Sequence, residues 1–314
     1  MKITDTQITR HELPAEIDGI KVRGNEVLMP ATFKCKITDI NLAQMNAIRR
    51  TAIDELEVQA LEIVKLDTND SYLIREMISD RVAEIPIKQV KLEKTPLSGN
   101  KDVYFIGPLK NTDRYADINT SLIQYFNKQE DNISVVKDLC NKFTIFHLAP
   151  LTNLELVLKV VTKRGYERAQ HSFVSRFIFR PTKQIDPQSE YTVPNSFEVE
   201  FDVKGNIDPE ELIKRCIQDI NSRIKYILDI LPNIIERKKD LVVITIPNES
   251  HTIANLLYTE LLGTEYKLNF CSYHVDHDVR NFNLQIRFDT SDKDNKYVID
   301  VITKAANKIM SGFE

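Results

Sequence analysis

The first regular pattern in the chain is an alternating strand that runs into an amphipathic helix. The stretch "ATFKCKI" places Phe33, Cys35 and Ile37 on one face, which predicts a half-buried strand. From Leu42 to Leu56 the apolar residues recur at spacings of three and four, which predicts a helix. A second strand is expected over "ALEIVKLDT", followed by a short helix within "YLIREMISDRVAEIPI".

The pattern weakens between residues 88 and 145. Turn-forming residues in "EKTPLSGNKD", one short strand in "VYFIG" and polar runs such as "NKQEDN" replace the long periodic segments. Regular strands resume with "FTIFHL", "LELVLKVV" and "FEVEFDV". We therefore expect a small β-rich domain inserted at this point.

The clearest helix signal starts at "DPEELI". Asp208 supplies an N-cap, Pro209 the first helical position and Glu211 an acid at the third. The apolar residues that follow keep a four-three rhythm suited to packing against another helix, and they are Ile213, Ile217, Ile220, Ile224, Ile227 and Leu231. Residues 232–240 are then predicted to form a linker.

The strand-into-helix order recurs in residues 241–314. "LVVITI" predicts a strand, "SHTIANLLYTELL" a helix, "YKLNFCSYHV" and "NFNLQIRF" two strands, and the apolar spacing after Val298 a last helix. When Asn255 is aligned with Asn46, Ile246 falls on Ile37. The repetition favours an α+β fold of two related modules that bury their helices against each other about a pseudo-two-fold axis. The alternative is chance similarity between two α+β units.

Paired modules would meet through their helices. The residues predicted for this inter-module interface are Met45, Ile48, Ile53, Ile213, Ile217, Ile220, Ile224, Ile253, Leu256, Leu257, Val298 and Ile302.

Composition narrows the function. The 314 residues carry a net charge of −4, so there is no overall cation excess of the kind that binds duplex nucleic acid. The four cysteines, Cys35, Cys140, Cys216 and Cys271, are far apart and form no CxxC pair, which favours a reducing compartment over a disulfide framework or zinc ribbon. The start of the chain has no apolar run typical of a signal peptide, so we expect a soluble intracellular protein with no membrane partner.

Residues 46–87 carry a series of motifs. These are Asn46, Ile48, Arg49 and Arg50 in one helix, Asn69 and Ser71 in a turn, Glu76, and "RVAEIP" from Arg81 to Pro86. The series resembles the signature of the assembly subunit of multisubunit RNA polymerases, a family that comprises bacterial alpha, its archaeal counterpart D and the third-largest component of polymerase II. "LAPLTNLELVLKVVTKRGYERAQHSFV" is similar to the return strands of that family.

A second motif lies in the C-terminal part. "ESHTIANLL" and the hairpin after it resemble the partner of that assembly protein, archaeal L or the eleventh component of polymerase II, through Glu249, His251, Thr252, Asn255, Tyr273 and His277. As a first-turn residue, His251 is expected to join Ser250 and Thr252 in capping the helix. Fusion of the two subunits is similar to the arrangement in some large cytoplasmic DNA viruses.

The resemblance implies a domain order. An N-terminal extension (1–29) precedes a discontinuous D-like dimerisation module (30–87 and 146–231), which is interrupted by the inserted domain (88–145). The linker (232–240) leads to an L-like dimerisation module (241–314), and the two modules form an intramolecular pseudo-heterodimer.

The resemblance also implies a non-catalytic assembly platform of a DNA-directed RNA polymerase. Its partners would be the second-largest subunit, then the largest, and small polymerase subunits, with DNA reached only through the complex. No cofactor and no homo-oligomer is expected. A viral origin would place the protein in a cytoplasmic factory, the virion or the nucleus. The family's Leu-Gly and Gly are replaced by Val82-Ala83 and Ala254, and the inserted domain retains only Cys140, so no metal is expected there.

The docking residues implied for the large subunits are Asn46, Arg49, Arg50, Glu76 and Arg81. Adjacent arginines on a helix point about 100° apart, so at least one can face a partner. A merely solvated helix face is the alternative. Glu76 and Arg81 are expected to pair and hold this surface.

Two other classes of function are kept as alternatives. "CSYHVDHD" gathers Cys271, His274, Asp276 and His277 as a metal cluster would, and a metal-dependent hydrolase or nuclease would use His274, His277, Asp276 and Asp278. Residues three apart on a strand point to opposite faces, which separates Cys271 from His274 and His274 from His277. The chain lacks a phosphate-binding glycine loop, a GxSxG elbow and an HExxH helix. A free-standing scaffold that reuses the dimerisation fold is the third possibility.

Overall fold

The computed structural model is an α+β protein, as the sequence predicts. It describes residues 1–10, 16–17, 20–21, 31–70, 74–85, 102–111, 114–127, 132–135, 144–182, 194–204, 207–238, 241–276, 281–288 and 294–313. None of the helices in these ranges combines the length and apolar character needed to cross a membrane. Two short strands, β2 (Glu16–Ile17) and β3 (Ile20–Lys21), pair with each other and not with the larger sheets.

The first sheet is antiparallel with the order β1-β4-β13-β12. Its strands are β1 (Lys2–Arg10), β4 (Ala31–Thr38), β13 (Ser196–Val203) and β12 (Val174–Pro181). Burial alternates along β4 and β13, so one face packs on the helices and the other faces solvent. The rings of Phe177 and Phe201 stack with centroids 5.0 Å apart on the packed face.

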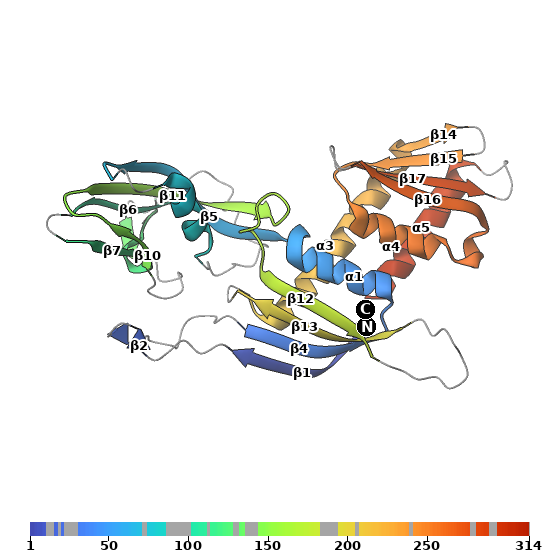
Figure 1. Cartoon of the computed structure of the whole chain (residues 1–314). Coiled ribbons are helices and arrows are strands. Elements are labelled where there is room, and N and C mark those ends of the chain that lie inside the picture. The colour runs from blue at the N-terminus through green and yellow to red at the C-terminus, as the bar shows by residue number, and fades with distance from the viewer. Residues whose placement is uncertain are drawn as a thin grey trace.

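Four helices form a layer beside that face (Figure 1). They are α1 (Leu42–Arg50), α3 (Pro209–Ile230), α4 (His251–Leu261) and α5 (Asn295–Ser311). The Asn41 side chain and Gln44 form a capping box at the start of α1, and the Asp208 side chain caps α3 as predicted. A single hydrophobic core contains residues of all four helices.

A π-turn, η1 (Thr51–Glu55), continues α1. The Leu56 amide donates to the Thr51 carbonyl five residues back, at 3.0 Å. The wider turn ends the helix and leaves the Glu55 side chain only 3% exposed. No part of the sequence pattern predicted it.

The second sheet has the order β5-β11-β6-β8-β9 and its own hydrophobic core. Its strands are β5 (Glu57–Thr68), β11 (Asn153–Arg164), β6 (Asp102–Lys110), β8 (Gln124–Asn127) and β9 (Asn132–Val135). The remaining elements of this part of the chain are the helix α2 (Arg75–Ala83) and the 3-10 turn η2 (Thr120–Leu122). They also include β7 (Ala116–Asn119) and β10 (Thr144–Leu148), which pair with each other. This sheet extends beyond the predicted insertion, 88–145, because β5 and β11, which were assigned to the dimerisation module, form two of its strands. Most of their buried apolar side chains pack into the second core, whereas Val58 at the start of β5 packs into the first.

The third sheet has the order β14-β15-β17-β16. Its strands are β14 (Ile235–Lys238), β15 (Leu241–Ile246), β17 (Asn281–Phe288) and β16 (Leu268–Asp276), with the 3-10 turns η3 (Leu231–Asn233) and η4 (Thr264–Tyr266) beside them. The expectation of a linker over 232–240 is wrong for residues 235–238. They pair with β15, because Ile235 packs on the core while Glu236 and Arg237 face solvent.

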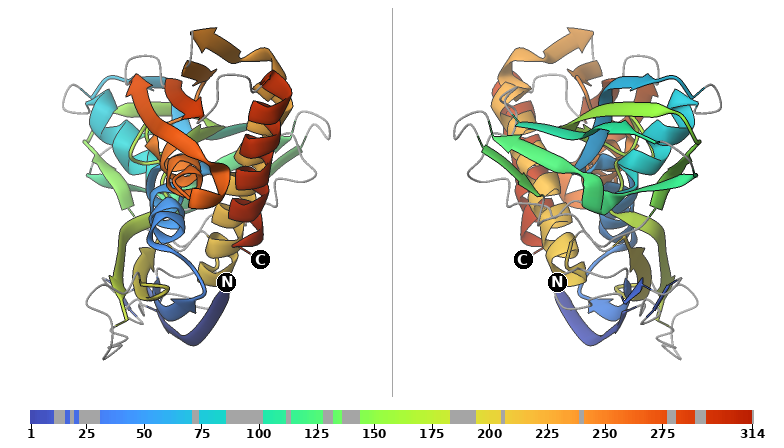
Figure 2. Two further views of the ribbon diagram at one scale, coloured as in Figure 1. Left: turned by 90° about the vertical axis from the view of Figure 1, so that its right-hand side faces the viewer. Right: turned by 90° about the vertical axis from the view of Figure 1, so that its left-hand side faces the viewer.

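The three sheets and the helices form a layered arrangement. The helices α1, α3, α4 and α5 lie between the first and third sheets, and the second sheet extends to one side on the long strands β5 and β11 (Figure 1). A view turned by 90° shows the same helical layer between the two sheets (Figure 2). The segment after residue 240 thus packs directly on the helices that precede it.

Candidate assembly interface

An ion-pair cluster centred on Arg223 lies inside the helical layer. The guanidinium makes two parallel contacts with the Glu249 carboxylate, Nε to Oε1 at 2.9 Å and Nη2 to Oε2 at 2.6 Å. Its Nη1 lies 2.6 Å from Glu55 Oε2 and 3.4 Å from Asp219 Oδ2. The side chains of Arg223, Glu55 and Glu249 are 10%, 3% and 6% exposed. Glu55 comes from η1, Arg223 from α3 and Glu249 from the turn before α4, so the cluster joins three segments of the chain.

Two hydroxyl groups and a second arginine complete the cluster. The Ser250 hydroxyl donates to Glu55 Oε1 at 3.0 Å, and the Thr252 hydroxyl donates to the same oxygen. Arg50 Nε donates to Thr252 Oγ1 at 2.9 Å. The expectation that His251 joins Ser250 and Thr252 in capping α4 is not met. Ser250 occupies the N-cap position without a side-chain capping hydrogen bond, and the Ser250 and Thr252 hydroxyls bind Glu55 instead.

Burial and neighbouring charges have opposite effects on the pKa values of Glu55, Asp219 and Arg223. Burial alone would raise the pKa of Glu55, but the Arg223 charge and the hydrogen bonds from Thr252, Arg223 and Ser250 together lower it. At Asp219 burial outweighs the weaker contact with Arg223, so its pKa is raised. Burial likewise opposes the charge of Arg223, yet its pKa is raised because Glu249, Glu55 and Asp219 stabilise the cation.

These shifts predict opposite pH dependences. Glu55 has a lowered pKa, so its stabilisation is complete above its ordinary pKa of about 4.3 and is lost as the pH falls through the lower folded-state value. Asp219 has a raised pKa, so its protonation stabilises the fold as the pH falls towards its ordinary value. Urea unfolding at a series of pH values should show a gain followed by a loss. Asp219→Asn should remove the gain and Glu55→Gln should reduce the loss, to which the lowered pKa values of Glu62, Glu200 and Glu265 also contribute. Unchanged profiles would contradict this assignment.

The predicted interface residues lie in the same core as the cluster. Ten of them are buried there, and Ile53 and Ile217 are partly buried against it. The buried ten are Met45, Ile48, Ile213, Ile220, Ile224, Ile253, Leu256, Leu257, Val298 and Ile302.

The predicted docking residues on α1 separate into two environments. Arg49 Nε and Nη2 both contact Asn46 Oδ1, at 3.1 and 3.0 Å, and both side chains are half-buried. Arg50 instead turns towards Thr252 and approaches Glu55 Oε1 at 3.9 Å. The neutral Asn46 amide orients Arg49 without neutralising its charge.

The predicted pair on α2 does not form in the described part of the chain. Arg81 Nη1 donates to the Ile145 carbonyl at 2.7 Å, while Glu76 lies exposed in the first turn of α2. The two residues are five positions apart, whereas neighbours on a helix surface are three or four positions apart, so their side chains do not meet along α2. Arg81 therefore anchors α2 to β10.

The remaining motif residues lie around α4. The ring of His251 meets Tyr273 edge-on with centroids 5.9 Å apart, and Tyr258 packs on the same tyrosine at 5.4 Å. Asn255 is half-buried in α4, and His277 lies outside the described residues.

The metal-site alternative gains no support from this geometry. Among the residues that the structure describes, no three His, Cys, Asp or Glu side chains gather as potential metal ligands. His274 is exposed on β16, and burial raises the pKa of the Cys271 thiol to about 11, which disfavours the thiolate that a metal requires. Cys140 is outside the described residues, while Cys35 and Cys216 are buried free thiols.

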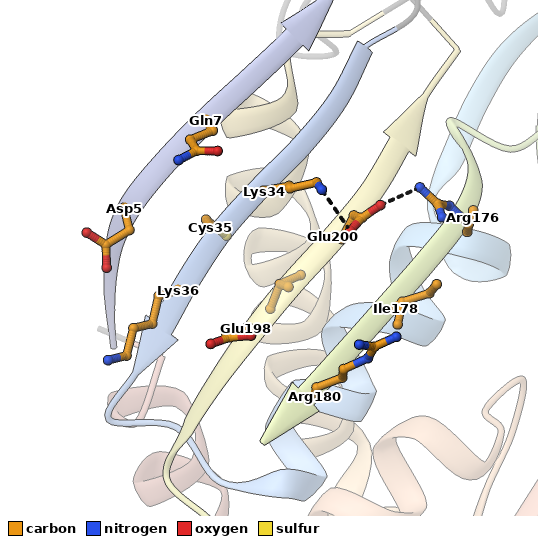
Figure 3. A pocket seen from close by; sticks show the side chains of 11 residues that line it. Asp5, Gln7, Lys34, Cys35, Lys36, Arg176, Ile178, Arg180, Glu198 and Glu200 are labelled. Atoms are coloured by element: carbon orange, nitrogen blue, oxygen red, sulfur yellow. Dashed lines mark hydrogen bonds and ion pairs between the residues drawn. The ribbon is translucent and has the colours of Figure 1, made fainter. Parts of the chain in front are cut away.

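The solvent face of the first sheet holds a shallow groove of about 420 Å³. Lys34 and Arg176 reach Glu200 from the two neighbouring strands, at 3.3 and 2.6 Å (Figure 3). Arg176 also contacts Asp202 at 2.8 Å. These ion pairs are exposed to solvent, unlike those of the buried cluster.

Comparisons with known proteins give one family match, in the C-terminal segment, and two partial alignments. Residues 242–314 match the family described as the RNA polymerase Rpb3/Rpb11 dimerisation domain. Over 57 residues, 18% of its length, the chain is 39% identical to the DNA-directed RNA polymerases IV and V subunit 3B of Arabidopsis thaliana. Over 94 residues, 30% of its length, it is 29% identical to the DNA-directed RNA polymerase II subunit rpb3 of Dictyostelium discoideum. These alignments cover 17% and 28% of the two relatives, so the chain matches less than a third of either. Similarity to RNA polymerase subunits, and to their dimerisation domain, is thus found.

Glu55, Asp219 and Arg223 were missed by sequence reasoning. Arg223 lies between Ile220 and Ile224 of the predicted apolar seam of α3, and a charged residue between two such positions is ordinarily interpreted as part of the solvent-exposed face. A signal was present, because "DINSRIKYI" places Asp219 four residues before Arg223.

Proposed function

We propose that the chain is a fused pair of dimerisation modules whose partner contact is made within one polypeptide. The observation that carries this is the position of the Arg223 cluster. Glu249 and Thr252 belong to the segment that matches a dimerisation domain, and they bind Arg223 and Glu55, which lie outside it. A dimerisation domain that is already occupied by its own chain has the geometry expected of a covalent heterodimer.

The function that this arrangement supports best is that of a non-catalytic assembly platform in a DNA-directed RNA polymerase. Both relatives are named as polymerase subunits, and the matched family is the dimerisation domain of such subunits. The paired modules form first, then bind the second-largest subunit, and the largest subunit follows. The second sheet is the inserted domain of the first module, and small polymerase subunits complete the complex.

A viral source belongs to the same proposal. It rests on the fused order of the two modules, which is similar to that of some large cytoplasmic DNA viruses. The polymerase would then act in the viral factory, in the virion or in the nucleus.

Isolation from native material tests the function. A tagged chain should co-purify with both large polymerase subunits in equal amounts and with RNA-synthesising activity. A chain recovered without those subunits would instead be a free-standing scaffold, and activity of the isolated chain with a bound metal would favour the hydrolase.

Arg49 is the docking residue that the geometry favours most. Asn46 orients its guanidinium, and no acidic side chain within the described residues pairs with it. Arg49→Glu should reduce capture of the purified second-largest subunit at least tenfold while the variant remains folded. Arg176→Glu, on the solvent face of the first sheet, is the control and should bind normally; equal capture by all three proteins would contradict this docking surface.

A further inference from the structure

The contacts at the starts of α1 and α4 differ in chemistry although the two helices occupy related places. The start of α4 meets α3 through the charged pair Glu249–Arg223. The start of α1 meets α5 through a neutral contact, in which Gln44 Nε2 donates to the Ile309 carbonyl at 3.4 Å. The helical layer therefore has one charged side and one neutral side.

The aligned sequences explain this asymmetry. When Asn46 is aligned with Asn255, the position of Glu249 is taken by Ile40 and that of Thr252 by Ala43. Ile40 is only 2% exposed, so the first module buries an apolar side chain where the second buries an acid.

The two long helices differ in the same way. α3 carries Arg223, whose side chain is 10% exposed, whereas the buried residues of α5 are all apolar: Val298, Val301, Ile302, Ala305, Ala306 and Ile309. The lysines of α5, at positions 296, 304 and 308, are exposed. A copy of the second module could not offer Glu249 a buried cation.

Self-pairing of either module would consequently lose the Glu249–Arg223 pair. Two C-terminal modules would bury two Glu249 carboxylates with no arginine, whereas in two N-terminal modules Arg223 would keep Glu55 and Asp219 but face Ile40 in place of Glu249. An uncompensated buried charge is strongly unfavourable, while replacing a whole buried ion-pair set by apolar groups is often tolerated. The charges thus penalise wrong partners more than they stabilise the right one.

We propose that the Arg223–Glu55–Glu249 cluster is the specificity determinant that makes the two modules pair with each other rather than with a second copy of themselves. The pairing that it disfavours is that of like modules from two copies of this chain, N-terminal with N-terminal or C-terminal with C-terminal. The inference rests on the proposed two-module architecture and not on polymerase activity.

The first test removes all three charges from the full chain. The triple variant Arg223→Met, Glu249→Leu, Glu55→Gln should fold, but more than half of it should appear as dimers or larger species after refolding at high concentration, as measured by light scattering. The wild type should stay monomeric. The control Lys34→Met, Arg176→Met, Glu200→Leu removes three surface charges and should also stay monomeric. A triple cluster variant that remains monomeric would overturn the proposal, because the cluster would then have no part in choosing the partner. A triple variant that fails to fold would also overturn it, because the cluster would then serve stability alone.

The second test exchanges charges between two chains. Arg223→Glu and Glu249→Arg each place like charges together within one chain, but each chain offers what the other needs. Refolded together, they should give a one-to-one dimer at least tenfold more abundant than any dimer of either variant alone. If the mixed dimer is not more abundant than the dimers of the single variants, the proposal is likewise overturned. Neither readout involves polymerase subunits, so failure of the wild type to co-purify with them would remove the proposed function and leave this result standing.

Discussion

Replacing Arg223 with methionine is expected to lower the free energy of unfolding by about 3–5 kcal/mol. Methionine fills a similar volume but leaves Glu55 and Glu249 facing each other in a site where they are 3% and 6% exposed. Neither carboxylate can then recover the solvation that it lost on folding. Urea unfolding of the full chain at pH 7 measures the effect.

The exposed network on the first sheet supplies the matched control. Arg176 also contacts two acids, Glu200 at 2.6 Å and Asp202 at 2.8 Å, but its side chain is 46% exposed. Arg176→Met should therefore cost no more than about 1 kcal/mol, because water solvates the acids that remain. A loss of similar size at both positions would show that burial is not what makes Arg223 important.

Leu257→Ala should lower the free energy of unfolding by about 2–5 kcal/mol. The side chain is 1% exposed on α4, in the core shared by all four helices, so its removal leaves a cavity between the C-terminal segment and the rest of the chain. Thermal or urea unfolding followed by circular dichroism measures the loss.

Leu262 offers the same chemistry on the surface. It follows α4 directly and is 56% exposed, so Leu262→Ala should change stability by no more than about 0.5 kcal/mol. If the two alanine variants were equally stable, α4 would not pack as described.

The long periodic segments were predictable from the sequence. The helix α3 begins at the Asp208 cap as expected, and the alternating strands β4, β13 and β15 appear where the apolar spacing places them. In each case burial of one face dictates the local pattern, so the pattern reveals the element.

Features fixed by tertiary contacts were not predictable. β14 is a short run with charged residues whose partner strand decides its conformation, and β5 and β11 join a sheet that their own alternation does not specify. The π-turn that buries Glu55 depends on the hydrogen bond from Leu56 to Thr51 and has no composition signature.

The candidate site was predicted only in part. The motif positions Glu249 and Thr252 were identified, but the groups that they bind, Arg223 and Glu55, lie 26 and 197 residues away along the chain. Arg50, one of the expected docking residues, binds Thr252 within the chain, a contact that the sequence did not predict. A single sequence shows which residues carry charge, but not which charges the fold buries together.

A double-mutant cycle between Arg223 and Glu249 tests most directly whether the C-terminal segment and the preceding chain fold as one body around this cluster. Unfolding free energies would be measured for the wild type, Arg223→Met, Glu249→Leu and the double variant. The structure predicts a coupling energy of at least about 1.5 kcal/mol, as found for close charge pairs across interfaces. Effects that add to within about 0.5 kcal/mol would contradict it, because residues that do not touch show no greater coupling.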